Sequence, residues 1–121
     1  MYNTIFLDTY AIFEFLRGNP SYKKYQEVIG ITTIFNIAEL NYCLKKEFGD
    51  LRADEITEKY AECIVPVLVE DVKSAMTFRH AHKGLSIPDA IGYIVAKRVG
   101  SAFLTGDEGF RTLENVEFVK K

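Results

Sequence analysis

The sequence predicts an α/β fold: three α/β/α layers around a mainly parallel sheet of four or five strands. Two observations support this prediction. Short apolar stretches that suit buried strands alternate along the chain with longer stretches in which apolar residues recur every three or four positions, as on one face of a helix. Strands that alternate with helices in this way usually pair in parallel, and the helices then cover both faces of the sheet.

Length, composition and charge narrow the range of functions. The chain has 121 residues, of which 48% are hydrophobic and 26% charged, a balance typical of a globular protein. We expect one domain over residues 1–121, because this length leaves little room for two. The formal net charge is −2, so a role with nucleic acid would depend on a local site rather than on a general basic surface.

The cysteines and the first residues bear on location. Cys43 and Cys63 lack the spacing of a zinc module or of a disulfide framework, which favours two reduced thiols. The opening residues, MYNTIFLDTY, contain no basic leader, no long apolar run and no small-residue cleavage site. We therefore expect a cytoplasmic protein that does not contact a membrane.

The first half of the chain predicts two strands and four helices. An apolar run at 3–7 predicts the first strand, and apolar residues at 12, 13 and 16 predict a helix over 9–16 that ends at Arg17-Gly18-Asn19-Pro20. A polar-faced helix is expected at 20–29, and the β-branched residues at 31–34 predict the second strand. Apolar positions 37, 40, 44 and 48 predict a helix that Gly49 ends, followed by a charged helix at 51–62.

The second half predicts three further strands. Residues 64–67 are apolar but include Pro66, which cannot donate a ladder hydrogen bond and so indicates an edge strand or a strand end. Helices are expected at 71–83 and at 87–99, the second so apolar that it should lie in the core. A strand at 102–105, a short helical turn at 107–113 and a strand at 116–119 complete the pattern.

Four acids occupy the positions where an open α/β sheet carries its chemistry. Asp8 and Asp107 directly follow strands, Glu39 lies at the start of the helix after the second strand, and Asp89 opens the apolar helix. Because parallel strands end at the same edge of a sheet, these acids could converge. Their mutual repulsion would then be relieved by a cation or by raised pKa values, and hard oxygen ligands favour Mg²⁺ or Mn²⁺.

Each acid also has a purely structural explanation. Asn36 and Glu39 have the spacing of a capping box, in which the first residue caps a helix and the acid bonds back to its backbone N–H. Ser86 and Asp89 repeat that spacing. Asp8 and Asp107 could serve as turn or N-cap residues. Capping alone, however, gives no reason for acids to gather at one edge of the sheet.

Four separated motifs give the chain a resemblance to the PIN-domain proteins of the VapC toxin type. These motifs are Phe6-Leu7-Asp8-Thr9, Ile37-Ala38-Glu39-Leu40, Pro88-Asp89-Ala90, and Leu104-Thr105-Gly106-Asp107-Glu108-Gly109-Phe110. They span nearly the whole chain in the family's order. Two positions depart from the pattern: Asn36 stands where many members have Ser or Thr, and Gly109 stands where many have a further acid.

The resemblance implies a metal-dependent endoribonuclease. It assigns metal binding and catalysis to Asp8, Glu39, Asp89 and Asp107, with Thr105 as a supporting polar residue and Mg²⁺ or Mn²⁺ as the cofactor. It also implies an RNA substrate, a cognate antitoxin and a homodimer. The missing acid at 109 would weaken a second metal position.

RNA would need cations near the acids, and the candidates are Arg17, Lys23, Lys24, Lys45, Lys46 and Arg79. Two other functions remain open at this point. An aspartate at a strand end also suits a phosphoacceptor domain, although that function explains Asp8 alone. A degenerate PIN domain could instead bind a partner without catalysis.

Overall fold

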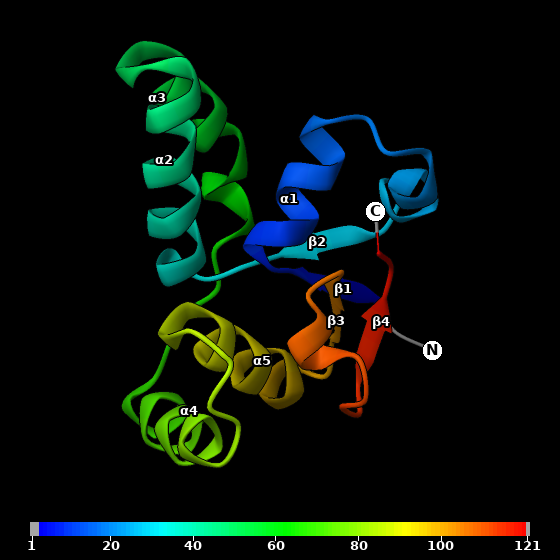
Figure 1. The fold of residues 1–121 in the computed structure, drawn as a ribbon, viewed down its shortest axis with the longest axis vertical. Coiled ribbons are helices and arrows are strands. Elements are labelled where there is room, and N and C mark those ends of the chain that lie inside the picture. Colours follow the sequence, from blue (N-terminus) through cyan, green and yellow to red (C-terminus); the bar gives the residue numbers. More distant parts are fainter. Residues whose placement is uncertain (1–2, 121) are drawn as a thin grey trace.

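The computed structural model describes residues 3–120 and contains a four-stranded sheet in which neighbouring strands are all parallel. Its strands are β1 (Thr4–Leu7), β2 (Ile29–Ile31), β3 (Ala102–Thr105) and β4 (Val116–Phe118), in the order β2-β1-β3-β4. The predicted fold class is confirmed, and the two central strands are β1, which immediately precedes Asp8, and β3, which ends at Thr105 (Figure 1).

Helices cover both faces of this sheet. The α-helices are α1 (Thr9–Leu16), α2 (Ile34–Phe48), α3 (Asp50–Tyr60), α4 (Val69–Ala81) and α5 (Ile87–Val99). Short 3₁₀ turns occur at η1 (Pro20–Tyr25), η2 (Ala61–Cys63) and η3 (Glu108–Phe110). Figure 1 shows α4 and α5 below the sheet, and α1, α2 and α3 above and beside it.

Alternation along the central strand divides the core between the two faces. Ile5 and Leu7 belong to the cluster formed with α1, α2 and α3, whereas Phe6 belongs to the cluster formed with α4 and α5. Phe6 stacks on Phe103 of β3, with ring centroids 5.3 Å apart. Because β1 is buried on both faces, its carboxyl end is held by packing from three layers.

Two predicted strands were placed wrongly. The second strand lies at 29–31 rather than 31–34, because Thr33 caps α2 and the helix already begins at Ile34. Residues 64–67 form no strand, and this segment makes a single parallel bridge between Ile64 and Thr32. The chain leaves the sheet there, and the carbonyl of Pro66 accepts from Arg98 of α5 instead of from a strand.

Two of the predicted helices also differ from the structure. The expected helix at 20–29 is the short 3₁₀ turn η1, which ends at Tyr25. The helix expected at 71–83 begins earlier, at Val69, because the Asp71 carboxylate accepts the Leu68 backbone N–H at 2.8 Å and stabilises the first turn. Within residues 3–120, no helix is long and apolar enough to cross a membrane.

Candidate metal centre

The candidate site lies where three helices begin beside the carboxyl end of β1. Helix α1 begins just after β1 ends. Helix α2 packs against both α1 and α5 beside this end of the sheet (Figure 1). A helix N-terminus carries partial positive charge and unpaired backbone N–H groups, so this arrangement favours carboxylates. The N-termini of these helices can therefore offset part of the repulsion between acidic side chains that gather there.

Asp8 is the most deeply placed of the four predicted acids. Its side chain is only 1% exposed, and it caps α1 by accepting the backbone N–H of Ala11 at 2.8 Å. The pKa of Asp8 is raised from 3.8 to about 8, chiefly by burial, which outweighs the hydrogen bonds from Thr105 and Ala11 that lower it. Charge repulsion from Asp89 and Asp107 contributes to the same increase. A buried carboxyl with acidic neighbours is one that a cation would stabilise in its charged form.

Thr105 joins Asp8 to the fourth motif. Its hydroxyl donates to the second carboxylate oxygen of Asp8 at 2.5 Å and accepts the backbone N–H of Asp107 at 3.0 Å. The two partners lie at the ends of the adjacent strands β1 and β3. Asp107 in turn caps η3 by accepting the N–H of Gly109 at 2.9 Å. This chain of bonds fixes the relative positions of two acids that are far apart in sequence.

Asp89 has both the structural role and the location that the sequence predicted. It forms a capping box with Ser86, in which Asp89 accepts the Ser86 backbone N–H at 3.1 Å and the Ser86 hydroxyl accepts the Asp89 N–H at 3.2 Å. Burial raises the pKa of Asp89, the bonds from Ser86 lower it, and Glu39 and Asp107 raise it. The capping box uses one carboxylate oxygen of Asp89, Oδ2, so the other oxygen, Oδ1, takes no part in the cap.

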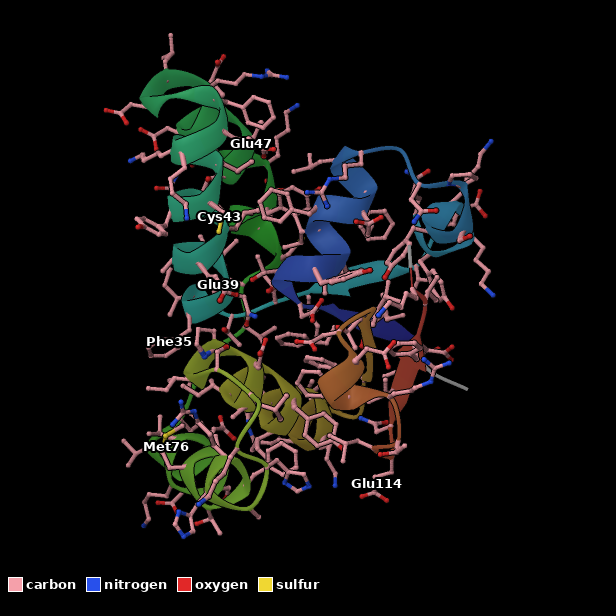
Figure 2. The ribbon with its side chains drawn as sticks, in the orientation of Figure 1. Phe35, Glu39, Cys43, Glu47, Met76 and Glu114 are labelled. Atoms are coloured by element: carbon pink, nitrogen blue, oxygen red, sulfur yellow. The ribbon has the colours of Figure 1, made fainter. Side chains whose placement is uncertain are left out.

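Glu39 does not have the capping role that its spacing indicated. The N-cap of α2 is Thr33, whose hydroxyl accepts the Asn36 backbone N–H, so Asn36 lies inside the helix and Glu39 lies in its second turn. The predicted capping box of Asn36 and Glu39 is therefore wrong. Figure 2 shows Glu39 one turn above Phe35, in the N-terminal half of α2, the helix that packs against α5. Glu39 raises the pKa of Asp89, so its carboxylate is near enough to repel the charge of that acid.

The four acids are thus electrostatic neighbours. Asp8 responds to Asp89 and Asp107, and Asp89 responds to Glu39 and Asp107. Among residues 3–120, however, no three His, Cys, Asp or Glu side chains are close enough together to hold a metal ion as they stand. The donor set still fits a divalent cation, because it consists of carboxylate oxygens from four elements and because burial disfavours their charge when they are unpaired. Binding would have to draw the side chains closer together.

Gly109 explains one departure from the family pattern. A Cβ at this position would lie 2.7 Å from a methyl carbon of Leu85 and 3.4 Å from the Asp107 carboxylate. The close approach of Leu85 leaves no room for a larger side chain unless Leu85 shifts. In this chain, the fourth motif therefore contributes Asp107 without a second acid at 109.

The candidate cations are partly engaged elsewhere. Arg17 pairs with Glu14 at 2.9 Å, Lys45 pairs with Asp54 at 3.2 Å, and Lys46 lies over the ring of Tyr42. Lys24 lies over the Tyr25 ring. Arg79 donates to the carbonyl of Leu85, next to the residue that caps α5. Of these side chains, Arg79 is anchored to the segment that leads into the acidic cluster.

A comparison with known protein families identifies the family of this chain. The model of the PIN domain family matches residues 5–116 of this chain. The chain belongs to the PIN domain family. That range contains all four acids and Thr105. The resemblance that the four motifs indicated is confirmed.

Three solved structures share the architecture. VapC20 of Mycobacterium tuberculosis, a toxin that cleaves the sarcin–ricin loop, aligns with a TM-score of 0.77, at 18% identity over 97% of this chain and 99% of that one. A toxin–antitoxin complex from Klebsiella pneumoniae aligns with a TM-score of 0.76, at 17% identity over 97% and 99%. VapBC2 of Rickettsia felis, bound to a promoter DNA fragment, aligns with a TM-score of 0.72, at 11% identity over 98% of both chains. At these identities, the likeness shows the fold alone. No curated protein sequence matches the chain.

Sequence reasoning missed two residues that shape this region. Thr33 is the true cap of α2, and Asn36 is a fully buried side chain rather than a cap. The signal was present, because Thr33 precedes Asn36 by the same three-residue interval that was assigned to Asn36 and Glu39.

A separate hollow of about 300 Å³, lined by Phe15, Tyr25, Tyr60 and other residues, does not include the four acids.

Proposed function

We propose that this PIN-domain chain is a metal-dependent endoribonuclease and the toxin of a toxin–antitoxin pair. The observation that carries the proposal is the environment of Asp8. It is a buried carboxyl whose pKa is raised to about 8, and charge repulsion from Asp89 and Asp107, which lie on two other elements, contributes to that increase. Such a cluster is costly for stability alone, and it suits a divalent cation. Membership of the PIN domain family and the presence of toxins among the structural relatives support the same function.

The residues of the chain would divide the work in the following way. Asp8, Glu39, Asp89 and Asp107 hold Mg²⁺ or Mn²⁺ through their carboxylates. The bound cation would lower the pKa of an attached water and neutralise charge on the phosphoryl oxygens of RNA. Thr105 holds Asp8 by its hydroxyl, and the Asp107 backbone N–H fixes that hydroxyl in turn. Asp8 must lose its proton for this role, so binding of the cation is coupled to deprotonation.

The partners follow from the same proposal. RNA is the substrate, and Arg79 is the cation best placed to attract its backbone, because it is fixed beside the start of α5. A cognate antitoxin is proposed from the toxin–antitoxin complexes among the relatives, and a homodimer is proposed from the resemblance that the four motifs carry. We further propose that residues 1–121 form one domain that acts in the cytoplasm. Growth arrest on expression, relieved by co-expression of the protein encoded beside it, tests the toxin role.

Cleavage of a mixed RNA substrate tests the enzymatic proposal. Wild-type protein should cleave RNA with Mg²⁺ or Mn²⁺ and should stop on addition of a chelator, and Asp107→Asn should be inactive. Asp50→Asn is the matched control, since it makes the same chemical change at an exposed acid on α3. Absence of cleavage by well-folded wild type across RNA substrates would leave a degenerate PIN domain that binds without catalysis.

A further inference from the structure

Asn36 is a buried polar side chain that the proposed chemistry has not used. It is 0% exposed, and its carboxamide oxygen accepts the Thr33 hydroxyl at 2.7 Å. Its amide nitrogen, Nδ2, is the buried side-chain nitrogen or oxygen that lacks a hydrogen-bond partner among residues 3–120. Buried amide donors are almost always bonded, because burial removes water that nothing else replaces. An unpaired donor of this kind therefore indicates an interaction that forms in another state of the protein.

The position of Asn36 shows which interaction that is. A Cβ on Gly92 of α5 would lie 3.1 Å from the Asn36 carboxamide oxygen and 2.8 Å from the Phe6 ring, so α2 and α5 approach closely there. Asp89 lies one turn before Gly92 on α5, and Glu39 lies one turn after Asn36 on α2. Residues three apart share a face of a helix. Asn36 therefore lies on the faces that carry two of the candidate metal ligands.

A contact with α1 completes the placement. The Thr9 hydroxyl lies 3.5 Å from the carbonyl oxygen of Asn36, and Thr9 directly follows Asp8. Asn36 thus lies at the junction of α1, α2 and α5, with its backbone carbonyl towards Thr9 and its carboxamide oxygen towards Gly92. Asp89 is close to this junction for two reasons. It lies one turn from Gly92 on α5, and Glu39 of α2 raises its pKa.

We infer that Asn36 is a positioning residue for the metal site: its Nδ2–H donates to the Asp89 carboxylate when the cation is bound and orients that carboxylate towards it. This inference rests on the proposed function. The Ser86 N–H holds one carboxylate oxygen of Asp89 from the α5 side, and Asn36 adds a donor from α2. Hydrogen bonds from such outer residues fix the orientation of ligating carboxylates. Their loss weakens metal affinity by about 10–100-fold.

Calorimetric titration with Mg²⁺ alone tests this role, together with thermal unfolding in the presence of chelator. Asn36→Leu keeps the branched shape and the number of side-chain heavy atoms and removes the donor, and it should weaken Mg²⁺ binding by about 10–100-fold. Thr33→Val is the matched control. It removes the same Thr33–Asn36 bond and keeps Nδ2. It should lower the melting temperature in chelator while leaving the Mg²⁺ affinity at the wild-type value. Asn36→Ser, which retains a hydroxyl donor, should recover part of the affinity.

The outcomes separate this inference from the proposed function. If Asn36→Leu binds Mg²⁺ as tightly as wild type, and only lowers the melting temperature as Thr33→Val does, Asn36 is a structural residue and the inference is overturned while the nuclease stands. If Thr33→Val weakens Mg²⁺ binding as much as Asn36→Leu, the effect comes from helix capping and not from Nδ2. If wild-type protein binds no divalent cation, the proposed function fails, and the positioning role fails with it.

Discussion

Replacement of Asp8 by Asn should make the metal-free protein more stable at neutral pH while it removes activity. The folded protein holds a proton on Asp8 up to about pH 8, whereas the unfolded chain releases it near pH 3.8. Between these values the folded state binds more protons than the unfolded state, so the free energy of unfolding falls as pH rises. The slope contributed by Asp8 is about 1.4 kcal/mol per pH unit.

The net effect follows from the contacts of Asp8. Asn retains the side-chain oxygen that caps α1 through Ala11, but its amide nitrogen cannot accept the Thr105 hydroxyl. Losing that one bond costs about 1 kcal/mol. From pH 4 to pH 7 the wild type loses about 4 kcal/mol through Asp8, so the variant should be more stable at pH 7 by about 3 kcal/mol. That difference is a large part of the 5–15 kcal/mol of stability that is usual for a domain.

Urea unfolding in chelator at several pH values from 5 to 7 measures this difference. Other groups titrate alike in both proteins, so the wild-type minus variant curve isolates Asp8. The gap should widen steadily as pH rises. Parallel pH curves would refute the reasoning, because they would mean that Asp8 is already ionised in the folded protein at pH 5 and that its burial is balanced by an interaction absent from this account.

Four further predictions follow from the same geometry. Metal binding at pH 7 should release close to one proton, because Asp8 is mostly protonated there, and the release should shrink by pH 9; calorimetry in two buffers of different ionisation enthalpy measures it. Thr105→Val removes a bond that lowers the pKa of Asp8, so Mg²⁺ affinity at pH 7 should fall and recover partly at higher pH. Glu39→Gln should change stability by less than about 0.5 kcal/mol in urea unfolding and abolish RNA cleavage, since Glu39 caps no helix. Thr33→Ala should cost about 1 kcal/mol in the same unfolding assay, since Thr33 is the cap; an unchanged free energy of unfolding would mean that Thr33 does not cap α2.

The order of strands and helices was predictable because each follows from local periodicity. The apolar run before Asp8 and the apolar helix at 87–99 have clear patterns, and both appear where they were expected. The boundary at 31–34 was not predictable from β-branching alone. Ile31 and Ile34 suit a strand, but the Thr33 hydroxyl between them caps a helix, and the cap decides the boundary.

The strand predicted at 64–67 failed for a different reason. Local hydrophobicity identifies residues that can be buried, but strand pairing depends on where the chain goes next. After the bridge between Thr32 and Ile64, the carbonyl of Pro66 is taken by Arg98, which also pairs with the buried Asp71 of α4. That long-range contact turns the chain towards α4, and no short window of sequence contains it.

The gathering of the acids was predictable, but the burial of Asp8 was not. The rule that parallel strands end at one edge predicted that Asp8 and Asp107 would be neighbours, and Asp107 does raise the pKa of Asp8. The depth of Asp8 depends on Thr105, 97 residues away in sequence, and on helices packed from both sides. The isolation of the Asn36 donor depends in the same way on the close approach at Gly92.

The measurement that tests the central claim most directly is calorimetric titration of wild type and Asp8→Asn with Mg²⁺ and with Mn²⁺. The account predicts saturable binding by wild type and none by the variant, which should remain folded and, without metal, more stable at neutral pH. Equal binding by both proteins, or no binding by folded wild type, would contradict a metal site at Asp8 and reduce the four acids to residues that shape the start of the helices.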